Sequence, residues 1–256
     1  ERRAVENRVC FAPSGFAFRQ KKIHALAVAP GCQAPAMYAL PVLLTVDVEI
    51  WLRLWGYRAD KFPEDFRSFI YGKTDRGDFG LRYQLSVLRE HGLTATFFVE
   101  SLFAGAFGGS PLEEIVGRIQ EAGQDVQLHV HPEWIRRIPG HFLANRPSED
   151  LCDYSADEQA RVLRQALEHL RAAGAAKVVA HRAGNFSGNP DTVRAAAEAG
   201  LRFDSSLNGG RTPRSAPWGF PRPDYPFDLE GIHEYPVTLF RDGPGHWRPV
   251  QLRACS

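Results

Sequence analysis

The stretch from Pro41 to Glu49 reads PVLLTVDVE, and it indicates the fold class more clearly than any other part of the chain. Its residues 41–47 form a continuous aliphatic and β-branched run, which is typical of a strand buried on both faces. Such strands belong to parallel sheets whose two faces are covered by helices. We therefore expect an α/β fold with this run as its first strand.

Short apolar runs followed by amphipathic stretches continue along the rest of the sequence. The expected later strands are 94–99, 125–131, 177–180, 201–204 and 231–237. Helices between them are indicated by leucines at helical spacing and by N-terminal capping signals, at Leu81 to Leu88, Ser110-Pro111, Ser155 to Glu158 and Asn189-Pro190. This alternation predicts a barrel or a doubly wound sheet.

Composition and charge exclude several classes of function. The 256 residues are 44% hydrophobic and 24% charged, with a formal net charge of +1, which suits a globular domain. No apolar run approaches the roughly 18 residues of a membrane span, and the charge gives no footprint for nucleic acid. We expect neither a membrane span nor a nucleic-acid partner, and the oligomeric state is not indicated. Without a convincing signal peptide, a cytoplasmic location is the default expectation and an extracytoplasmic one the alternative.

The first 36 residues differ in character from the rest. They hold six basic and two acidic side chains and show no periodicity. We interpret residues 1–36 as a disordered extension or as translated upstream sequence, with Met37 as the start. Residues 37–256 are then expected to form the functional domain.

Two pairs of polar side chains carry the clearest chemistry. Asp47 and Glu49 lie two residues apart on a predicted strand, so they share a face and repel each other unless a cation or a proton lies between them. His129 and His131 also share a face, and both imidazoles can bind one metal. Imidazole with carboxylate is a usual ligand set for a catalytic zinc ion. Taken singly, either pair is also compatible with solvent-exposed side chains that bind nothing.

The positions of these pairs favour a shared site. Both pairs, together with His181-Arg182 and Asp204, fall at the ends of predicted strands. In a parallel α/β fold the carboxyl ends of all strands lie on one side, where active sites gather. The sequence therefore predicts a metal site on that side.

At this point the sequence resembles a known family, the polysaccharide deacetylases with the NodB-homology domain, or carbohydrate esterase family four. The similar segments, in the family's order, are TVDVE (45–49), LTATFFV (93–99), GQDVQLH (123–129), HRAG (181–184) and FDSS (203–206). The resemblance implies a distorted (β/α) barrel of about seven parallel strands, with 37–256 as the catalytic domain. It also implies hydrolysis of an N- or O-acetyl group on a carbohydrate, a carbon–nitrogen hydrolase of the deacetylase type.

The resemblance also implies roles for individual residues. Asp47 would be the catalytic base, Arg182 would orient it, and Glu49, His129 and His131 would bind the metal. The expected metal is zinc, with cobalt, nickel or iron as alternatives. The physical logic agrees, because a divalent cation polarises the acyl carbonyl while a nearby carboxylate takes a proton from water.

Three departures separate this sequence from the family pattern. The family usually places its two histidines four residues apart, whereas here Glu133 stands at that position and the second histidine is His131, so Glu133 could replace a ligand. The proline expected after the arginine motif is absent, and Gly184 follows Ala183 instead. The late histidine that protonates the leaving group is hard to place, and His233 is our choice for it.

Aromatic and acidic side chains near these motifs suggest a substrate cleft. Trp51 and Trp134 closely follow the proposed ligands and are expected to contact the sugar, as is Asp204, although such rings more often pack a loop down. Trp55, Tyr57 and Trp218 lie in nearby loops. Two rival functions stay open on the same fold, a catalytically impaired carbohydrate-binding protein and a hydrolase of a non-sugar amide.

Overall fold

The computed structural model describes residues 41–51, 59–209, 218 and 225–251. The chain divides into two units, Glu1–Pro41 and Val42–Ser256, and the second carries every element described below. The segment 1–36 and Met37 lie outside the described residues.

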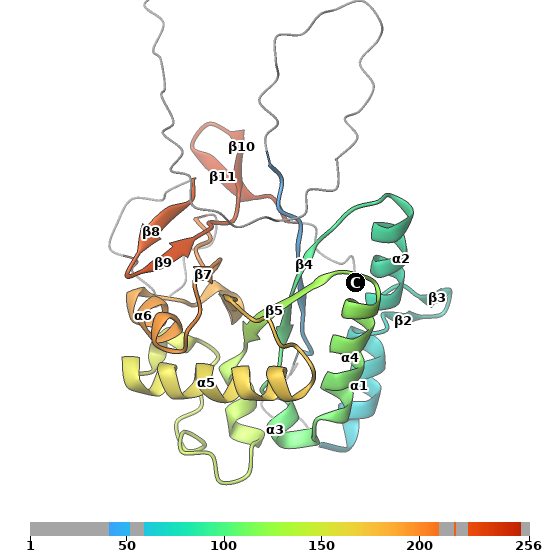
Figure 1. Ribbon diagram of the computed structural model, residues 1–256, viewed down its shortest axis with the longest axis horizontal. Coiled ribbons are helices and arrows are strands. Elements are labelled where there is room, and N and C mark those ends of the chain that lie inside the picture. Colours follow the sequence, from blue (N-terminus) through green and yellow to red (C-terminus); the bar gives the residue numbers. More distant parts are fainter. Residues whose placement is uncertain (1–40, 52–58, 210–217, 219–224, 252–256) are drawn as a thin grey trace, which may run out of the picture. The chain divides into compact units, whose positions relative to one another are not determined.

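A seven-stranded sheet forms the centre of the second unit (Figure 1). Its strands follow the order β1-β4-β5-β6-β7-β9-β8, and every neighbouring pair is parallel except β8 with β9. The expected sheet of about seven mostly parallel strands is therefore present, and β8 departs from it by running antiparallel to β9. The strands are Thr45–Val48 (β1), Thr96–Glu100 (β4), Asp125–Val130 (β5), Ala180–Ala183 (β6), Phe203–Asp204 (β7), Phe227–Leu229 (β8) and Ile232–Glu234 (β9).

Helices connect and cover the parallel strands. They are Phe62–Phe69 (α1), Leu81–Glu90 (α2), Ala104–Phe107 (α3), Ser110–Glu121 (α4), Ala156–Ala172 (α5) and Pro190–Glu198 (α6). Helices α4 and α5 both contact β5, and α5 lies beside α6 (Figure 1). Two small hairpins complete the described part, Lys73–Thr74 (β2) with Gly77–Asp78 (β3), and Leu239–Gly243 (β10) with His246–Pro249 (β11).

The capping signals in the sequence correspond to real helix starts. Ser155 accepts a hydrogen bond from the Glu158 backbone N–H, and the Glu158 carboxylate accepts one from Ser155 in return, which closes a capping box at α5. Asn189 and Thr192 form the equivalent pair at α6. At α4 the cap residue is Gly109, because Ser110 is already helical.

The first strand is less buried than expected. It begins at Thr45 and lies at the edge of the sheet, where β4 is its partner. Val42 and Leu43 before it are each 68% exposed. These two residues precede β1 and are not part of the sheet, so the prediction of burial on both faces is wrong for the start of this run.

The fourth expected strand is displaced toward its carboxyl end. Residues 177–180 were predicted, but β6 covers Ala180–Ala183. The side-chain oxygen of Gln127 on β5 accepts hydrogen bonds from the backbone N–H groups of Val179 and Ala180, at 2.8 and 2.7 Å. This side chain takes up donors that a longer ladder would use, so β6 begins later and includes His181 and Arg182.

Strand register aligns the candidate residues. Glu100 at the end of β4 lies beside His129 on β5, which lies beside Arg182 on β6. Val48 pairs with Val99, so Glu49 follows at the next level of the sheet. The register therefore brings the polar strand ends to one edge, as the parallel fold predicts.

Candidate active site

Three side chains converge at this edge of the sheet. The ligand atoms of Glu49, His129 and His131 all lie within 4.8 Å of one another. Oε2 of Glu49 lies 3.2 Å from Nε2 of His129 and also contacts Nε2 of His131. Both imidazoles are almost completely buried. We call these three residues the triad.

The hydrogen bonds of His129 show what the triad can hold. Its Nδ1 donates to the backbone oxygen of Arg182 at 2.8 Å. In a neutral imidazole this places the proton on Nδ1 and leaves the lone pair of Nε2 facing the Glu49 carboxylate. Two acceptors that face each other need a proton or a cation between them, so the arrangement fits a divalent metal ion.

The charges of the triad also favour a bound metal ion. Burial opposes a charge on the Glu49 carboxylate, but the positive charge of the adjacent His131 imidazole holds its pKa well below the ordinary value. Burial also opposes a charge on His131, yet the Glu49 carboxylate raises the pKa of this imidazole. The carboxylate is therefore stable only with positive charge beside it, which a metal ion would supply.

Glu133 stands outside the triad. Its Oε2 lies 3.6 Å from Nδ1 of His131, whereas the Nε2 of the same ring faces Glu49. A carboxylate behind a ligating imidazole is the usual arrangement for fixing the tautomer of that ring. The geometry thus favours Glu133 as a support for His131 over Glu133 as a ligand.

Trp51 contacts the triad from the solvent side. Its indole N–H donates to Oε1 of Glu49 at 2.6 Å, which leaves Oε2 for the two imidazoles. The side chain is 54% exposed. Trp51 therefore combines a hydrogen bond to a candidate ligand with a side chain that is more than half exposed.

Asp47 and Arg182 form an ion pair beside the triad. Nη1 of Arg182 donates to Oδ1 of Asp47 at 2.7 Å and to the hydroxyl of Thr45 at 3.1 Å. Arg182 is 4% exposed, and its guanidinium carbon lies 4.3 Å from the centre of the Phe98 ring. The structure thus brings together all five of the residues expected to bind the metal or act on water.

Two predicted substrate residues are buried instead. Trp134 is fully enclosed and packs against the rings of Phe62, Phe103 and Phe107, so it belongs to the core. Asp204 is 1% exposed and accepts a 2.7 Å hydrogen bond from Nδ1 of His181. Neither side chain can reach a substrate, so both expectations are corrected.

Asp204 shares a buried acidic pair with Glu234 on β9. Burial opposes a charge on Asp204, but the hydrogen bond from His181 lowers its pKa. Burial and the charge of Asp204 together raise the pKa of Glu234 well above its ordinary value. The pKa values of these two carboxyl groups are therefore shifted in opposite directions, and the pair forms a buried contact between β7 and β9.

His233 does not lie with the triad. Its side chain is 53% exposed and pairs with Asp228 on the neighbouring strand, and its ring packs near Phe203. His129 lies on β5, and β9 is three positions away from β5 in the sheet. Among the described residues, nothing connects His233 to the site, so the structure corrects this choice of general acid.

The other aromatic residues divide into two groups. Trp218 is 7% exposed and packs in the core, so it offers no open ring. Trp55 and Tyr57 lie outside the described residues.

The loop 132–153 contains two short 3-10 helices, Pro132–Arg137 and Leu151–Asp153.

Three residues around the site were missed by sequence reasoning. Thr45 and Ser205 bind the guanidinium of Arg182, and Gly184 lies against the His131 ring. Single threonine, serine and glycine residues are common in any sequence, so they carried no signal of their own. Their position within the TVDVE, HRAG and FDSS segments was the available hint.

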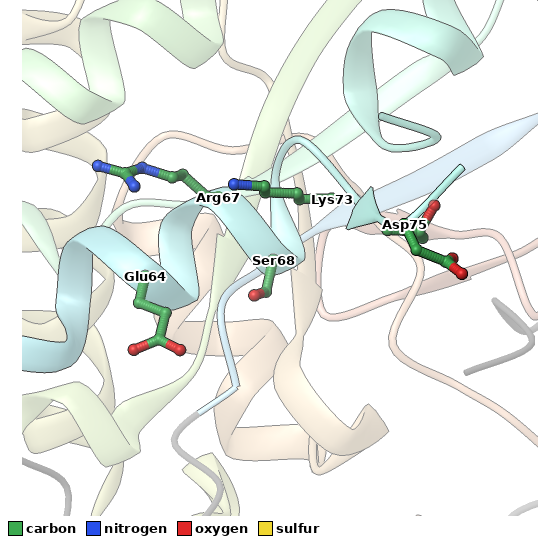
Figure 2. Close-up of a pocket in the computed structure, with 6 residues that line it drawn as sticks. Glu64, Arg67, Ser68, Lys73 and Asp75 are labelled. Carbon is green, nitrogen blue, oxygen red and sulfur yellow. The ribbon is translucent and has the colours of Figure 1, made fainter. Parts of the chain in front are cut away.

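A hollow on the outer surface is separate from this site. It has a volume of about 430 Å³ and is lined by Glu64, Arg67, Ser68, Lys73, Thr74 and Asp75. Figure 2 shows that these side chains project from α1 and from the β2–β3 hairpin. None of them belongs to the triad or to the Asp47–Arg182 pair.

Comparison with known proteins assigns the family. The sequence profile of the polysaccharide deacetylase family matches residues 75–203, about half of the chain. The protein belongs to this family, and the resemblance noted from the sequence motifs is confirmed. A search of curated proteins gave no match.

The chain is also similar to proteins of known structure. A protein of Mycobacterium smegmatis assigned as a polysaccharide deacetylase is 22% identical, with a TM-score of 0.51, over 77% of this chain and 58% of that one. A family 4 carbohydrate esterase of Streptomyces lividans, solved with acetate, is 17% identical, with a TM-score of 0.39, over 65% of this chain and 63% of that one. A pseudoenzyme of the same esterase family from Bacillus anthracis is 19% identical, with a TM-score of 0.37, over 62% and 40%.

The chain corresponds to only part of each of these proteins. The chain spans less than two thirds of the length of each of the three proteins. The Mycobacterium smegmatis structure supports the α/β fold with its distorted barrel. Within the part of the chain that the structure describes, no helix has both the length and the apolar character needed to cross a bilayer.

Proposed function

We propose that the protein is a metal-dependent hydrolase that removes an N- or O-acetyl group from a carbohydrate. The observation that carries this proposal is the triad of Glu49, His129 and His131, with the Asp47–Arg182 pair beside it. Membership of the polysaccharide deacetylase family supports the reaction class and the acetylated carbohydrate as substrate.

The triad would hold the metal through one carboxylate and two imidazoles. This ligand set suits zinc, and cobalt, nickel or iron are alternatives. When bound, such an ion polarises the acyl carbonyl and lowers the pKa of water. The ligands present the required lone pairs, because Nδ1 of His129 is engaged by a backbone oxygen and Oε1 of Glu49 by Trp51.

Asp47 would act as the general base. Its Oδ1 accepts the hydrogen bond from Arg182, and we assign Oδ2 as the atom that takes the proton from the attacking water. The guanidinium fixes the orientation of the carboxylate, since it is itself buried and held by several acceptors. Arg182 thus positions the base and does not contact the acyl group.

Trp51 would contribute to carbohydrate binding. Its ring is half exposed next to the triad, and sugar rings pack their apolar faces on such indoles. Its N–H bond to Glu49 fixes the ring relative to the triad. A sugar stacked on Trp51 would be oriented by the same residue that orients a metal ligand.

A second candidate function is carbohydrate binding without turnover. The observation that favours it is the position of His233, which leaves the leaving-group proton without an assigned donor among the described residues. A third function, hydrolysis of a non-sugar amide, uses the same groups, because the site recognises an acyl carbon.

Metal quantification combined with acetate release would separate these functions. The purified protein should contain a divalent metal and release acetate from at least one of a panel of acetylated oligosaccharides. Asp47→Ala should abolish release and keep the metal, whereas His129→Ala should lose the metal. Sugar binding that is unchanged by a chelator and yields no acetate would favour the binding protein. Amide cleavage without acetate release from sugars would favour the third function.

A further inference from the structure

Strands β6 and β7 are joined by a run of side-chain bonds in register. His181 bonds to Asp204, Arg182 to Ser205, and the Ala183 backbone N–H to the Ser206 hydroxyl. Consecutive side chains of a strand point to opposite faces, so the His181–Asp204 and Arg182–Ser205 bonds lie on opposite faces of the sheet. The Arg182–Ser205 contact is the one on the face of the Asp47 carboxylate.

Ser205 holds the guanidinium of Arg182 at two points. Its backbone oxygen accepts from Nε at 3.0 Å, and its hydroxyl oxygen accepts from Nη2 at 2.8 Å. Nη1 remains for Asp47, which it reaches at 2.7 Å. Ser205 therefore binds one edge of the planar guanidinium, and the other edge faces the Asp47 carboxylate.

The hydroxyl of Ser205 is itself fixed in direction. It donates to the backbone oxygen of Tyr235 at 2.8 Å, so its lone pairs face Arg182. Ser205 is 8% exposed and Arg182 is 4% exposed, so water does not compete freely for these bonds. The stack of the guanidinium on Phe98 restricts movement out of its plane and leaves rotation within the plane to be restricted by Ser205.

We propose that Ser205 is a positioning residue, which sets the in-plane orientation of Arg182 and through it the Asp47 carboxylate. This inference rests on the proposed function for its catalytic consequence. Without the hydroxyl, Nη2 would lack its acceptor in a buried place, and the guanidinium would rotate in its plane until Nη2 met another acceptor. Asp47 would then lose its fixed orientation while the metal triad, which Ser205 does not contact, stays intact.

The test compares Ser205→Ala, Ser205→Thr and Ser206→Ala in the full-length, metal-loaded protein. Ser206→Ala is the matched control, because it removes a buried hydroxyl from the next residue, one that bonds Ala183 and Asp204 instead of Arg182. We expect kcat for acetate release to fall about 10- to 100-fold in Ser205→Ala, with KM and metal content unchanged. Ser205→Thr should restore most of kcat, and Ser206→Ala should lower only the melting temperature.

A second measurement does not need turnover. The buried Arg182 Nη2–H group that donates to the Ser205 hydroxyl should give a slowly exchanging signal in ¹⁵N–¹H spectra, and its exchange should become faster in Ser205→Ala but not in Ser206→Ala. If the wild-type protein releases no acetate from any substrate, the proposed function fails, while this measurement still tests Ser205. Unchanged exchange and unchanged kcat in Ser205→Ala, or equal losses of kcat in the two alanine variants, would overturn the proposal.

Discussion

Gly184 lies directly against the imidazole of His131. A Cβ atom placed on Gly184 would be 2.7 Å from both Cγ and Nδ1 of that ring, far inside van der Waals contact. Both residues are points at which the sequence departs from the pattern of the family, in the spacing of its histidines and in the missing proline. Because they contact each other, we interpret the two departures as one change. A histidine two residues after His129 needs the space that glycine leaves.

Gly184→Ala should therefore weaken metal binding. The new methyl group must displace the His131 ring, since the backbone of Gly184 is enclosed in the protein. We expect the metal Kd to rise by about 10-fold or more, on the scale seen when a ligand loses its support. Competition with a chromogenic chelator measures the Kd. Gly117→Ala is the control, because a Cβ there meets nothing within 4 Å and should leave the Kd unchanged. Equal Kd values in both variants would contradict the steric account.

Glu133→Ala should also weaken metal binding without removing it. The carboxylate lies behind His131 and favours the tautomer that presents Nε2 to the triad. Loss of such a support typically costs 10- to 100-fold in affinity, or about 1 to 3 kcal/mol. Glu49→Ala, which removes a ligand, should have a larger effect in the same chelator titration. If Glu133→Ala released the metal as completely as Glu49→Ala, Glu133 would be a ligand.

Trp51→Phe should separate the two roles of the Trp51 side chain. Phenylalanine keeps a ring for a sugar but lacks the N–H that donates to Glu49. We expect weaker metal binding with little change in KM, whereas Trp51→Ala should also raise KM. Because the side chain is 54% exposed, neither change should cost more than about 0.5 kcal/mol in the free energy of unfolding. An unchanged KM in Trp51→Ala would exclude stacking on this ring.

Trp134→Ala should lower the stability of the folded protein. The ring is fully buried among three phenylalanine rings, and its removal leaves a cavity. We expect a loss of about 3 to 5 kcal/mol in the free energy of unfolding, measured by urea denaturation. Trp134→Phe should recover part of this loss. A variant as stable as the wild type would show that Trp134 is not part of the core.

Glu100 should give the fold a dependence on pH. Burial raises the pKa of this carboxyl to about 8, although the N–H groups of Leu102 and Phe103 act in the opposite direction. Between the ordinary value of 4.5 and about 8, the folded protein therefore keeps a proton that the unfolded chain loses. The stabilisation is complete below the lower pKa and is lost as pH rises through the window, by at most about 1.4 kcal/mol per pH unit.

Glu100→Gln should remove this slope, because glutamine stays neutral throughout. The measurement is the free energy of unfolding of both proteins from pH 5 to pH 9 in the presence of a chelator. The chelator keeps the metal from contributing, and the difference between the two curves isolates Glu100. Parallel curves would mean that Glu100 is ionised in the folded protein over the whole range.

The order and type of the main elements were predictable because local signals decide them. The predicted strand 125–131 corresponds to β5, Asp125–Val130, and the capping residues Ser155 and Asn189 begin α5 and α6. These signals depend on apolar periodicity and on bonds within one turn of a helix. The position of a strand within the sheet depends on distant partners, so neither the edge position of β1 nor the exposure of Val42 and Leu43 before it was predictable.

Trp51 and Trp134 show that burial at the site also depends on distant contacts. Trp51 and Trp134 each follow a proposed ligand closely in the sequence, and we expected both at the substrate. Whether a ring is exposed or enclosed depends on what other elements bring against it, and α1 and α3 bring aromatic rings to Trp134. Similarly, His233 was predicted from its place along the chain, but its strand lies three positions from β5.

By itself, the sequence determined the alternation of strands and helices, the family, and two same-face pairs of polar residues at strand ends. Those properties follow from residue types at short, fixed spacings. Only the tertiary structure decided that Glu49, His129 and His131 meet, that Asp47 is held by Arg182, and that Gly184 makes room for His131. These contacts join residues that are up to about 135 positions apart, and their geometry depends on strand order and register, which no short stretch of sequence contains.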